Sequence, residues 1–299
     1  MKIDKVGILG CGLMGSGIAQ VSATAGFDVV VLEAEQRFLD KGFSSVDKSL
    51  ARFAEKGKLK ESPEAIRARL KGTLNPEDLA DCDIVIEAII ENIGEKKKMF
   101  EKIDSIVKKD AIFATNTSSI SVTEVMTATK RPDRFVGLHF FNPVPLMALV
   151  EVVRTIATGS SVFEVVYEFG KKLGKTPVRT SDKTGFIVNR LLVPYLLDAI
   201  RAYEEGVGSI ADIDLAMMKG CGYPMGPFTL LDFVGLDTTY YITHVMFDEF
   251  KERRFASPPL LKRMVMAGWY GKKTGRGFYD WSNPDKPEPQ DPALQGNRA

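Results

Sequence analysis

The stretch from Lys5 to Glu33 constrains the fold of this 299-residue chain more than any other part of the sequence. A short apolar run, residues 6–9, leads into Gly10-Cys11-Gly12-Leu13-Met14-Gly15, which is a G-x-G-x-x-G pattern. An amphipathic segment follows as far as residue 25, and a second apolar run ends at an acid. This order predicts a buried parallel strand, a glycine turn, a helix and a second parallel strand.

Each glycine of the turn has its own physical role. Gly10 permits the tight turn, Gly12 lets the backbone approach a pyrophosphate without an intervening Cβ, and Gly15 lets the helix pack close to the strand. Leu13 and Met14 lie where the helix begins, and the free N–H groups there attract phosphate. The turn is therefore predicted to bind a dinucleotide; an ordinary glycine turn is the alternative.

The acid at the end of the second strand indicates which dinucleotide binds. Glu33 follows Gly15 at about the distance expected for a carboxylate that accepts hydrogen bonds from the adenosine ribose. A carboxylate at this position repels a 2′-phosphate, so NAD is favoured over NADP. The complete pattern predicts an α/β fold with a Rossmann-like, doubly wound and mostly parallel sheet.

Composition excludes several other classes of protein. The chain is 44% hydrophobic and 26% charged, as expected for a soluble globular protein, and its net charge of +1 gives no field that would attract nucleic acid. The most apolar stretch, residues 186–200, contains charged residues and is too short to cross a bilayer. Three scattered cysteines predict neither disulfides nor a metal site. Because Met1 leads directly into the first strand, we expect no targeting peptide and a cytoplasmic protein.

Strand and helix patterns alternate until about residue 182, and only helical patterns follow. We therefore expect an NAD-binding domain over residues 1–183 and an all-α domain over residues 184–299. The expected strands cover residues 83–88, 111–115, 135–141, 149–154 and 176–178, and the expected helices cover residues 36–71, 95–107, 162–173, 187–205, 210–219, 227–250 and 259–267. The polar, proline-rich tail over residues 283–299 is expected to be poorly ordered.

Three groups of polar residues are candidates for function. Asn116 to Ser119 follow a predicted strand, where ligands bind in doubly wound sheets, although Ser118 or Ser119 capping the helix near Val122 explains them equally well. His139 and Glu151 lie on neighbouring predicted strands; a core histidine beside an unrelated acid is the alternative. A basic face, Lys48, Arg52 and Lys56, recurs every four residues, and spacing alone favours a solvated helix face.

Several motifs together resemble the L-3-hydroxyacyl-CoA dehydrogenase family, and especially its stand-alone bacterial 3-hydroxybutyryl-CoA dehydrogenase type. The resemblance covers residues 4–280. The motifs are NTSS at 116–119, HFFNPVP at 139–145, LVEVV at 149–153, DKTGFIVNRLL at 182–192, GYPMGPFTLLDFVGLD at 222–237 and GKKTGRGFY at 271–279.

The resemblance implies roles for these residues. His139 would be the catalytic base, Glu151 its orienting carboxylate, and Ser118 and Asn189 would hold the reacting region of an acyl-CoA substrate. Further cofactor contacts would be Glu91, Lys96, Asn116, Ser118, Asn142 and Lys273. Lys48, Ser49, Arg52 and Lys56 match the region that binds the phosphates of coenzyme A, which reverses the interpretation from spacing alone. Glu33 stands where many relatives have aspartate, which makes the preference for NAD over NADP less firm.

The implied activity is the NAD-dependent interconversion of (S)-3-hydroxyacyl-CoA and 3-ketoacyl-CoA, above all 3-hydroxybutyryl-CoA and acetoacetyl-CoA. A homodimer through the helical domain is also expected, because its helices carry many apolar positions for one small bundle to bury, and the resemblance implies a dimer as well; a well-packed monomeric bundle is the alternative. Two alternatives remain open. One is a related dehydrogenase of free β-hydroxyacids or sugar acids, and the other is a non-catalytic, crystallin-like NAD(H)-binding protein.

Overall fold

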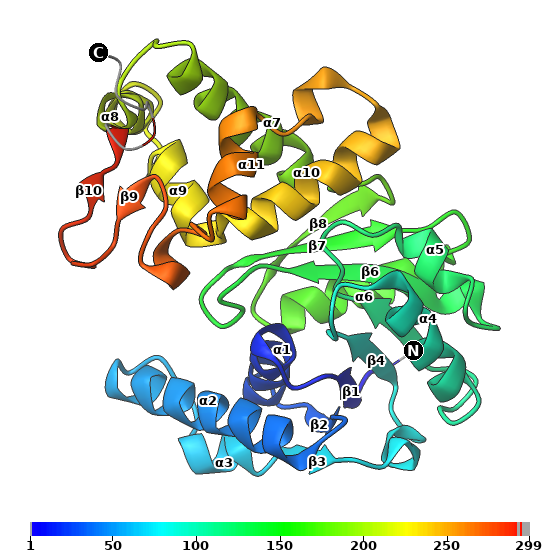
Figure 1. Cartoon of the computed structure of the whole chain (residues 1–299). Helices are drawn as coiled ribbons and strands as arrows, with labels where there is room; N and C mark the ends of the chain where they lie inside the picture. Colours follow the sequence, from blue (N-terminus) through cyan, green and yellow to red (C-terminus); the bar gives the residue numbers. More distant parts are fainter. Residues whose placement is uncertain (1, 292–293, 295–299) are drawn as a thin grey trace. The chain divides into compact units, whose positions relative to one another are not determined.

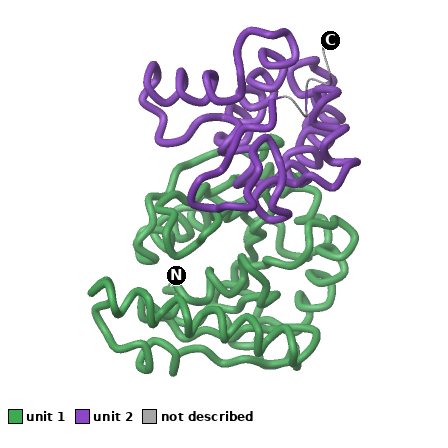
Figure 2. The backbone as a smooth tube through the Cα atoms, turned by 60° about the vertical axis from the view of Figure 1, so that its left-hand side comes forward, with its two compact units in different colours: residues 1–186 green, residues 187–299 purple. Residues whose placement is uncertain are grey.

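The computed structural model describes residues 2–291 and residue 294 of the chain. The chain divides into two compact units, Met1–Phe186 and Ile187–Ala299 (Figure 2). Each unit has hydrophobic cores of its own, because the buried clusters draw their members from one unit or the other.

The first unit is built on a sheet that has eight strands within the described residues (Figure 1). Its spatial order is β3-β2-β1-β4-β5-β6-β7-β8, and every neighbouring pair is parallel except β6 and β7. The strands are β1 (Lys5–Leu9), β2 (Asp28–Leu32), β3 (Leu70–Thr73), β4 (Ile84–Glu87), β5 (Ile112–Thr115), β6 (Phe135–Phe140), β7 (Leu149–Arg154) and β8 (Thr176–Ser181). This topology confirms the predicted Rossmann-like, mostly parallel sheet.

Helices cover both faces of this sheet, because successive strand residues point to opposite faces. In β1, Val6 and Ile8 join the core shared with α1 (Leu13–Thr24), α2 (Gln36–Glu55) and α6 (Ser160–Lys172). Leu9 joins the opposite core, shared with α4 (Ile93–Asp104) and α5 (Val122–Met126). Both faces of the strands are buried, which explains why they read as continuous apolar runs in the sequence.

The region predicted as helix over residues 36–71 is only partly helical. Helix α2 ends at Glu55, and Gly57 follows with a φ of +62°, a conformation that favours glycine. A short helix, α3 (Pro63–Arg67), and the edge strand β3 complete the segment. The strand was missed because its four residues, Leu-Lys-Gly-Thr, are too few and too polar to show a period-two apolar pattern.

The second unit is helical, as predicted, with a small antiparallel ribbon. Its helices are α7 (Val188–Glu204), α8 (Ile210–Gly220), α9 (Pro227–Val234), α10 (Leu236–Phe250) and α11 (Pro259–Met266). The single helix predicted over residues 227–250 is wrong, because Gly235 has a φ of +98° and separates α9 from α10. A right-handed helix cannot pass through a residue with that φ.

The C-terminal tail is more ordered than its composition predicts. Strand β10 (Glu288–Pro289) pairs antiparallel with β9 (Tyr279–Asp280). The Ile210 backbone N–H donates to Asp291 Oδ1 at 2.9 Å, and the Tyr203 hydroxyl donates to the Asp291 carbonyl at 3.1 Å. The predicted disorder is therefore wrong for residues 283–291, and residues 292, 293 and 295–299 lie outside the described residues.

A buried carboxylate on α9 holds this C-terminal ribbon. Asp232 is 1% exposed and accepts hydrogen bonds from the Phe278 N–H (2.9 Å), the Tyr279 N–H (2.8 Å) and the Trp281 indole N–H (2.8 Å). Burial, reinforced by the nearby charge of Asp214, raises the pKa of Asp232 to about 6, although its three N–H donors lower it.

We predict that Asp232→Ala destabilises the protein by about 3 kcal/mol or more, because three buried donors lose their acceptor. Urea unfolding measures this loss, with Asp248→Ala as the control, since Asp248 is 74% exposed and pairs with Lys251 at the surface. Equal stability of the two variants would contradict the role assigned to Asp232.

The same substitution should also change the pH dependence of stability. The pKa of Asp232 is above 3.8 in the folded chain, so the folded chain keeps a proton between about pH 4 and 6 that the unfolded chain has lost. The stability that this carboxyl contributes therefore falls as the pH rises through that window. The difference between wild type and Asp232→Ala should be smaller at pH 7 than at pH 4.

Candidate functional site

The glycine turn brings α1 against the end of β1. Gly10 has a φ of +93°, and Gly12 precedes the first turn of α1, which begins with Leu13 and Met14. A Cβ on Gly15 would lie 2.0 Å from the Gly10 carbonyl oxygen, so no other residue fits there. A Cβ on Gly12 would meet no atom within 4 Å, which leaves its backbone open to a ligand.

A cavity of about 690 Å³ opens beside this turn, at the carboxyl ends of β1, β2 and β4. Its lining residues come from the glycine turn, the end of β2, one side of α2 and the segment after β4; they include Gly10, Gly12, Leu13, Met14, Glu33, Lys41 and Ile89. Ligands bind at this edge in doubly wound sheets. The bare Gly12 backbone and the start of α1 fit a pyrophosphate, and the volume suits part of a dinucleotide.

Glu33 lies in this cavity and folds back onto the turn. Its carboxylate accepts hydrogen bonds from the Cys11 N–H and the Ala34 N–H, both at 2.7 Å. Burial, and then the charge of Glu33, raises the pKa of the Cys11 thiol to about 12. The thiol therefore stays protonated near neutral pH and is not a nucleophile.

A buried imidazole–carboxylate pair lies on the antiparallel strands β6 and β7. His139 and Glu151 are directly opposite in the register, and His139 Nδ1 is 2.7 Å from Glu151 Oε2. Their exposed fractions are 5% and 0%. The ring centroids of Phe141 and Phe186 lie 4.5 Å and 5.5 Å from that of His139. The carboxylate thus fixes the ring orientation and favours the tautomer with its proton on Nδ1, so Nε2 can accept a proton.

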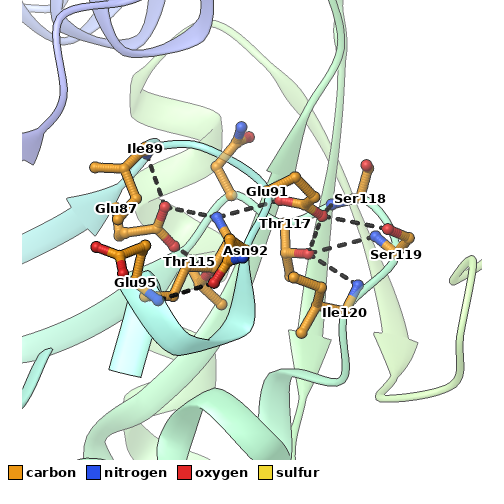
Figure 3. Close-up of polar contacts among 12 residues, drawn as sticks. Glu87, Ile89, Glu91, Asn92, Glu95, Thr115, Thr117, Ser118, Ser119 and Ile120 are labelled. Atoms are coloured by element: carbon orange, nitrogen blue, oxygen red, sulfur yellow. Dashed lines mark hydrogen bonds and ion pairs between the residues drawn. The ribbon is translucent and has the colours of Figure 1, made fainter. Parts of the chain in front are cut away.

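The loop after β5 is tied to the end of β6 and to a glutamate. Asn116 Oδ1 accepts a hydrogen bond from the Phe140 N–H at 2.9 Å, one residue beyond His139. The Ser118 N–H donates to Glu91 Oε1 at 3.1 Å (Figure 3). Neither Ser118 nor Ser119 caps α5; the cap is Ser121, whose hydroxyl accepts from the Glu124 N–H. The capping explanation for Ser118 and Ser119 is therefore wrong.

Glu91 and Lys96 are in contact with each other and with a residue that the sequence did not single out. Lys96 is 1% exposed, and its Nζ lies 2.7 Å from Glu87 Oε1 and 3.2 Å from Glu91 Oε2. Burial opposes ionisation of Glu91, but Lys96 and the Thr117 hydroxyl outweigh it and hold the pKa of Glu91 below its usual value. Glu87 was missed because it ends an apolar strand, where periodicity gives no sign of a buried charge.

The basic face lies on α2 and at its end. Lys48 and Arg52 are exposed on the helix, Ser49 is half-buried, and Lys56 is the C-cap residue. The neighbouring acid Asp47 pairs with Arg67 at 3.1 Å and not with these cations. Within the described residues, Lys48, Arg52 and Lys56 have no salt bridge, so their charges are available to an anion.

The remaining predicted site residues lie in other segments. Asn142 is exposed in the loop after β6. Asn189 lies in the first turn of α7, and the Lys273 ammonium pairs with the Asp237 carboxylate at 2.5 Å; both belong to the helical unit.

The described residues contain neither a metal cluster nor a membrane-spanning helix. No group of three or more His, Cys, Asp or Glu side chains is placed there to hold a metal ion. No helix in that part of the chain combines the length and apolar content needed to span a membrane.

The two glycines of the turn give a matched pair of variants. We predict that Gly12→Ala folds normally but weakens NADH binding at least tenfold, because the new methyl occupies the space open to the pyrophosphate. Gly15→Ala should instead destabilise the fold, since its methyl overlaps the Gly10 carbonyl. NADH fluorescence titration and thermal unfolding separate these effects. Unchanged NADH affinity in Gly12→Ala would mean that the pyrophosphate binds elsewhere.

Comparison with known proteins supplies the family. Residues 5–183 match the model of the 3-hydroxyacyl-CoA dehydrogenase NAD binding domain, and residues 185–281 match that of the C-terminal domain. The chain is 47% identical over 277 residues to a probable 3-hydroxybutyryl-CoA dehydrogenase of Deinococcus radiodurans, covering 93% of this chain and 100% of the relative. It is 46% identical over 287 residues to human mitochondrial hydroxyacyl-coenzyme A dehydrogenase, covering 93% and 91%.

A solved structure agrees with the sequence relatives. The crystal structure of (S)-3-hydroxybutyryl-CoA dehydrogenase PaaH1 from Ralstonia eutropha superposes with a TM-score of 0.91 at 43% identity, covering 94% of this chain and 100% of that one. Both domain models match in the expected order, and together they account for nearly the whole chain. The chain therefore belongs to the 3-hydroxyacyl-CoA dehydrogenase family.

Proposed function

We propose that this protein interconverts (S)-3-hydroxyacyl-CoA and 3-ketoacyl-CoA with NAD, with 3-hydroxybutyryl-CoA and acetoacetyl-CoA as its main substrates. The observation that carries the proposal is the buried His139–Glu151 pair, 2.7 Å apart, in a chain whose first domain is the family's NAD-binding domain. Relatives from Mycobacterium tuberculosis and Clostridioides difficile, 49% and 43% identical, are also named 3-hydroxybutyryl-CoA dehydrogenase, which supports the four-carbon substrate.

His139 acts as the general base in oxidation. Because Glu151 accepts the Nδ1 proton, Nε2 carries the lone pair that takes the proton of the substrate C3 hydroxyl. Bound NAD supplies the hydride acceptor. The imidazolium that forms is stabilised by the fully buried Glu151 carboxylate, as in a hydrolase triad. In reduction His139 returns the proton to the C3 oxygen. General-base catalysis of this kind contributes about 10²–10⁴ in rate.

The remaining site residues bind and orient the two ligands. Ser118 and Asn189 donate hydrogen bonds to the C3 oxygen and the thioester region, where charge changes during the reaction. Asn116 and Asn142 lie beside the nicotinamide; the Asn116 oxygen accepts from the Phe140 N–H, so its amide group contributes donors to the ligand. Glu91, Lys96 and Lys273 contact the cofactor as well.

The basic face binds the phosphates of coenzyme A. Lys48, Arg52 and Lys56 carry three cationic charges with no salt bridge among the described residues, and Ser49 adds a hydroxyl on the same helix. The planar guanidinium of Arg52 can grip a phosphate with two parallel hydrogen bonds. Free hydroxyacids lack these phosphates, so the face argues against a free-acid or sugar-acid dehydrogenase.

We further infer the organisation of the protein. Residues 1–183 bind NAD, and residues 184–299 contribute to substrate binding and form a homodimer. Large apolar side chains of the helical unit remain exposed, among them Leu191 (70%), Leu215 (54%) and Phe233 (49%), and a partner subunit would cover them. The absence of a membrane-spanning helix among the described residues and the bacterial relatives support a cytoplasmic enzyme.

One assay series tests the function. The protein should oxidise NADH in the presence of acetoacetyl-CoA. We expect kcat/KM to be at least a hundredfold lower with free acetoacetate, and the reduction of acetoacetyl-CoA to be slower when NADPH replaces NADH. Faster turnover of free acetoacetate or of a sugar acid would replace the proposal with the free-acid alternative. Tight NADH binding with no turnover of any CoA ester would favour the non-catalytic, crystallin-like alternative.

We predict that replacing Lys48, Arg52 and Lys56 together by alanine raises the KM for acetoacetyl-CoA at least tenfold and leaves kcat nearly unchanged, because the phosphates lie far from the reacting carbon. Steady-state kinetics at low salt measure this change. The matched control replaces Lys109, Lys130 and Lys172, which are exposed elsewhere on the same unit. The same KM in both triple variants would show that the basic face is a solvated surface that does not bind coenzyme A.

A further inference from the structure

Three charges, two of them buried, lie in a row behind the loop that carries Ser118. Glu87, at the end of β4, is 0% exposed, and Lys96, near the start of α4, is 1% exposed. The Lys96 ammonium lies between two carboxylates, 2.7 Å from Glu87 Oε1 and 3.2 Å from Glu91 Oε2. We call this row the Glu87–Lys96–Glu91 relay. The Glu91 side chain is 28% exposed, but Glu87 and Lys96 are held away from water, and burying such a pair is costly if stability is its only purpose.

One end of the relay is fixed to the sheet. Glu87 Oε2 accepts a hydrogen bond from the Thr115 hydroxyl at 2.6 Å, and Glu87 Oε1 accepts one from the Ile89 N–H at 2.8 Å (Figure 3). Glu87 and Thr115 are direct neighbours in the register of β4 and β5. Both carboxylate oxygens thus accept hydrogen bonds, one from the last residue of β5 and one from the backbone just after β4, so Glu87 is held in place beside the Lys96 ammonium.

The other end of the relay holds the loop. Glu91 Oε1 accepts hydrogen bonds from the Thr117 hydroxyl, from the Ser118 N–H at 3.1 Å and from the Ser119 hydroxyl at 3.3 Å (Figure 3). One carboxylate oxygen therefore gathers three successive residues of the loop. Because Lys96 holds the other oxygen of Glu91, the position of the ammonium determines where Glu91, and with it Ser118, can lie.

We propose that Glu87 is a positioning residue for the dehydrogenase reaction. Glu87 acts through Lys96 and Glu91 to hold Ser118 at the C3 oxygen of the substrate. The proposal rests on the proposed function, in which Ser118 contacts that oxygen. Glu87 itself touches neither substrate nor the reacting atoms. Without its carboxylate, the Lys96 ammonium would move toward Glu91, draw that side chain from the loop and release the 117–119 segment.

The test compares Glu87→Gln with wild type. Glutamine keeps the size of the side chain and one acceptor but removes the charge that anchors Lys96. We expect kcat for acetoacetyl-CoA reduction to fall at least tenfold while the KM for the CoA ester changes less than twofold, because the contacts to the coenzyme A phosphates remain. Hydrogen–deuterium exchange of the ligand-free protein should rise in peptides that cover residues 116–121.

Two further variants keep the test decisive. Glu95→Gln is the control, since Glu95 is exposed on the same helix and pairs with Lys98 at the surface; it should behave as wild type. Thr115→Val removes only the hydroxyl that holds Glu87 and should show the same signature at about a threefold loss of kcat. If Glu87→Gln does not fold, the kinetics and exchange of Thr115→Val test the positioning role of Glu87 instead.

The possible outcomes separate the two proposals. Wild type that does not reduce acetoacetyl-CoA overturns the proposed function, and the exchange data then still decide whether Glu87 holds the loop. Active wild type with Glu87→Gln kinetics like those of Glu95→Gln overturns the positioning role. A fall in kcat without increased exchange at residues 116–121 also overturns it, because Glu87 would then act by a route other than the loop.

Discussion

The close approach of two backbone segments at Gly10 and Gly15 is the contact on which the rest of the first unit depends. The Gly10 carbonyl occupies the space where a side chain at position 15 would have to be, so α1 lies directly against β1. That packing aims the start of α1 across the carboxyl edge of the sheet, where the cavity opens and where β2, β4 and β5 also end. Glu33 directly follows β2, and Glu87 is the last residue of β4. The loop that carries Ser118 follows β5.

Carboxylates hold a buried basic side chain at two places, at this edge of the sheet and on the neighbouring hairpin of β6 and β7. Glu151 holds His139, and Glu87 with Glu91 holds Lys96. A buried ion pair contributes little net stability compared with well-packed apolar residues, because removing charges from water is costly. Such groups are therefore expected where a side chain must be held in one orientation. The buried acid Asp232 of the helical unit has a different role, because it accepts hydrogen bonds from two backbone N–H groups and one indole N–H and so holds the C-terminal ribbon against α9.

The sequence predicted those features that depend on local pattern. The glycine turn, the alternation of strands and helices, and the adjacency of His139 and Glu151 all follow from apolar runs and short connections. Features fixed by contacts between distant segments were missed. The edge strand β3 is too short to show a pattern. The Asp182 carboxylate, about sixty residues away in the sequence, accepts hydrogen bonds from the Val122 and Thr123 N–H groups in the first turn of α5. Glu87 was hidden for the same reason, because its partners come from α4 and β5.

In the proposed reaction His139 exchanges a proton with the substrate, and Glu151 acts through His139. A double-mutant cycle on kcat for acetoacetyl-CoA reduction, with His139→Gln, Glu151→Gln and the double variant, tests this most directly. We predict that each single variant folds, binds NADH and loses at least a hundredfold in kcat, and that the double variant is at most a few-fold slower than His139→Gln. Activity of His139→Gln within tenfold of wild type, a loss under about 1.4 kcal/mol, or fully additive losses, would contradict the claim.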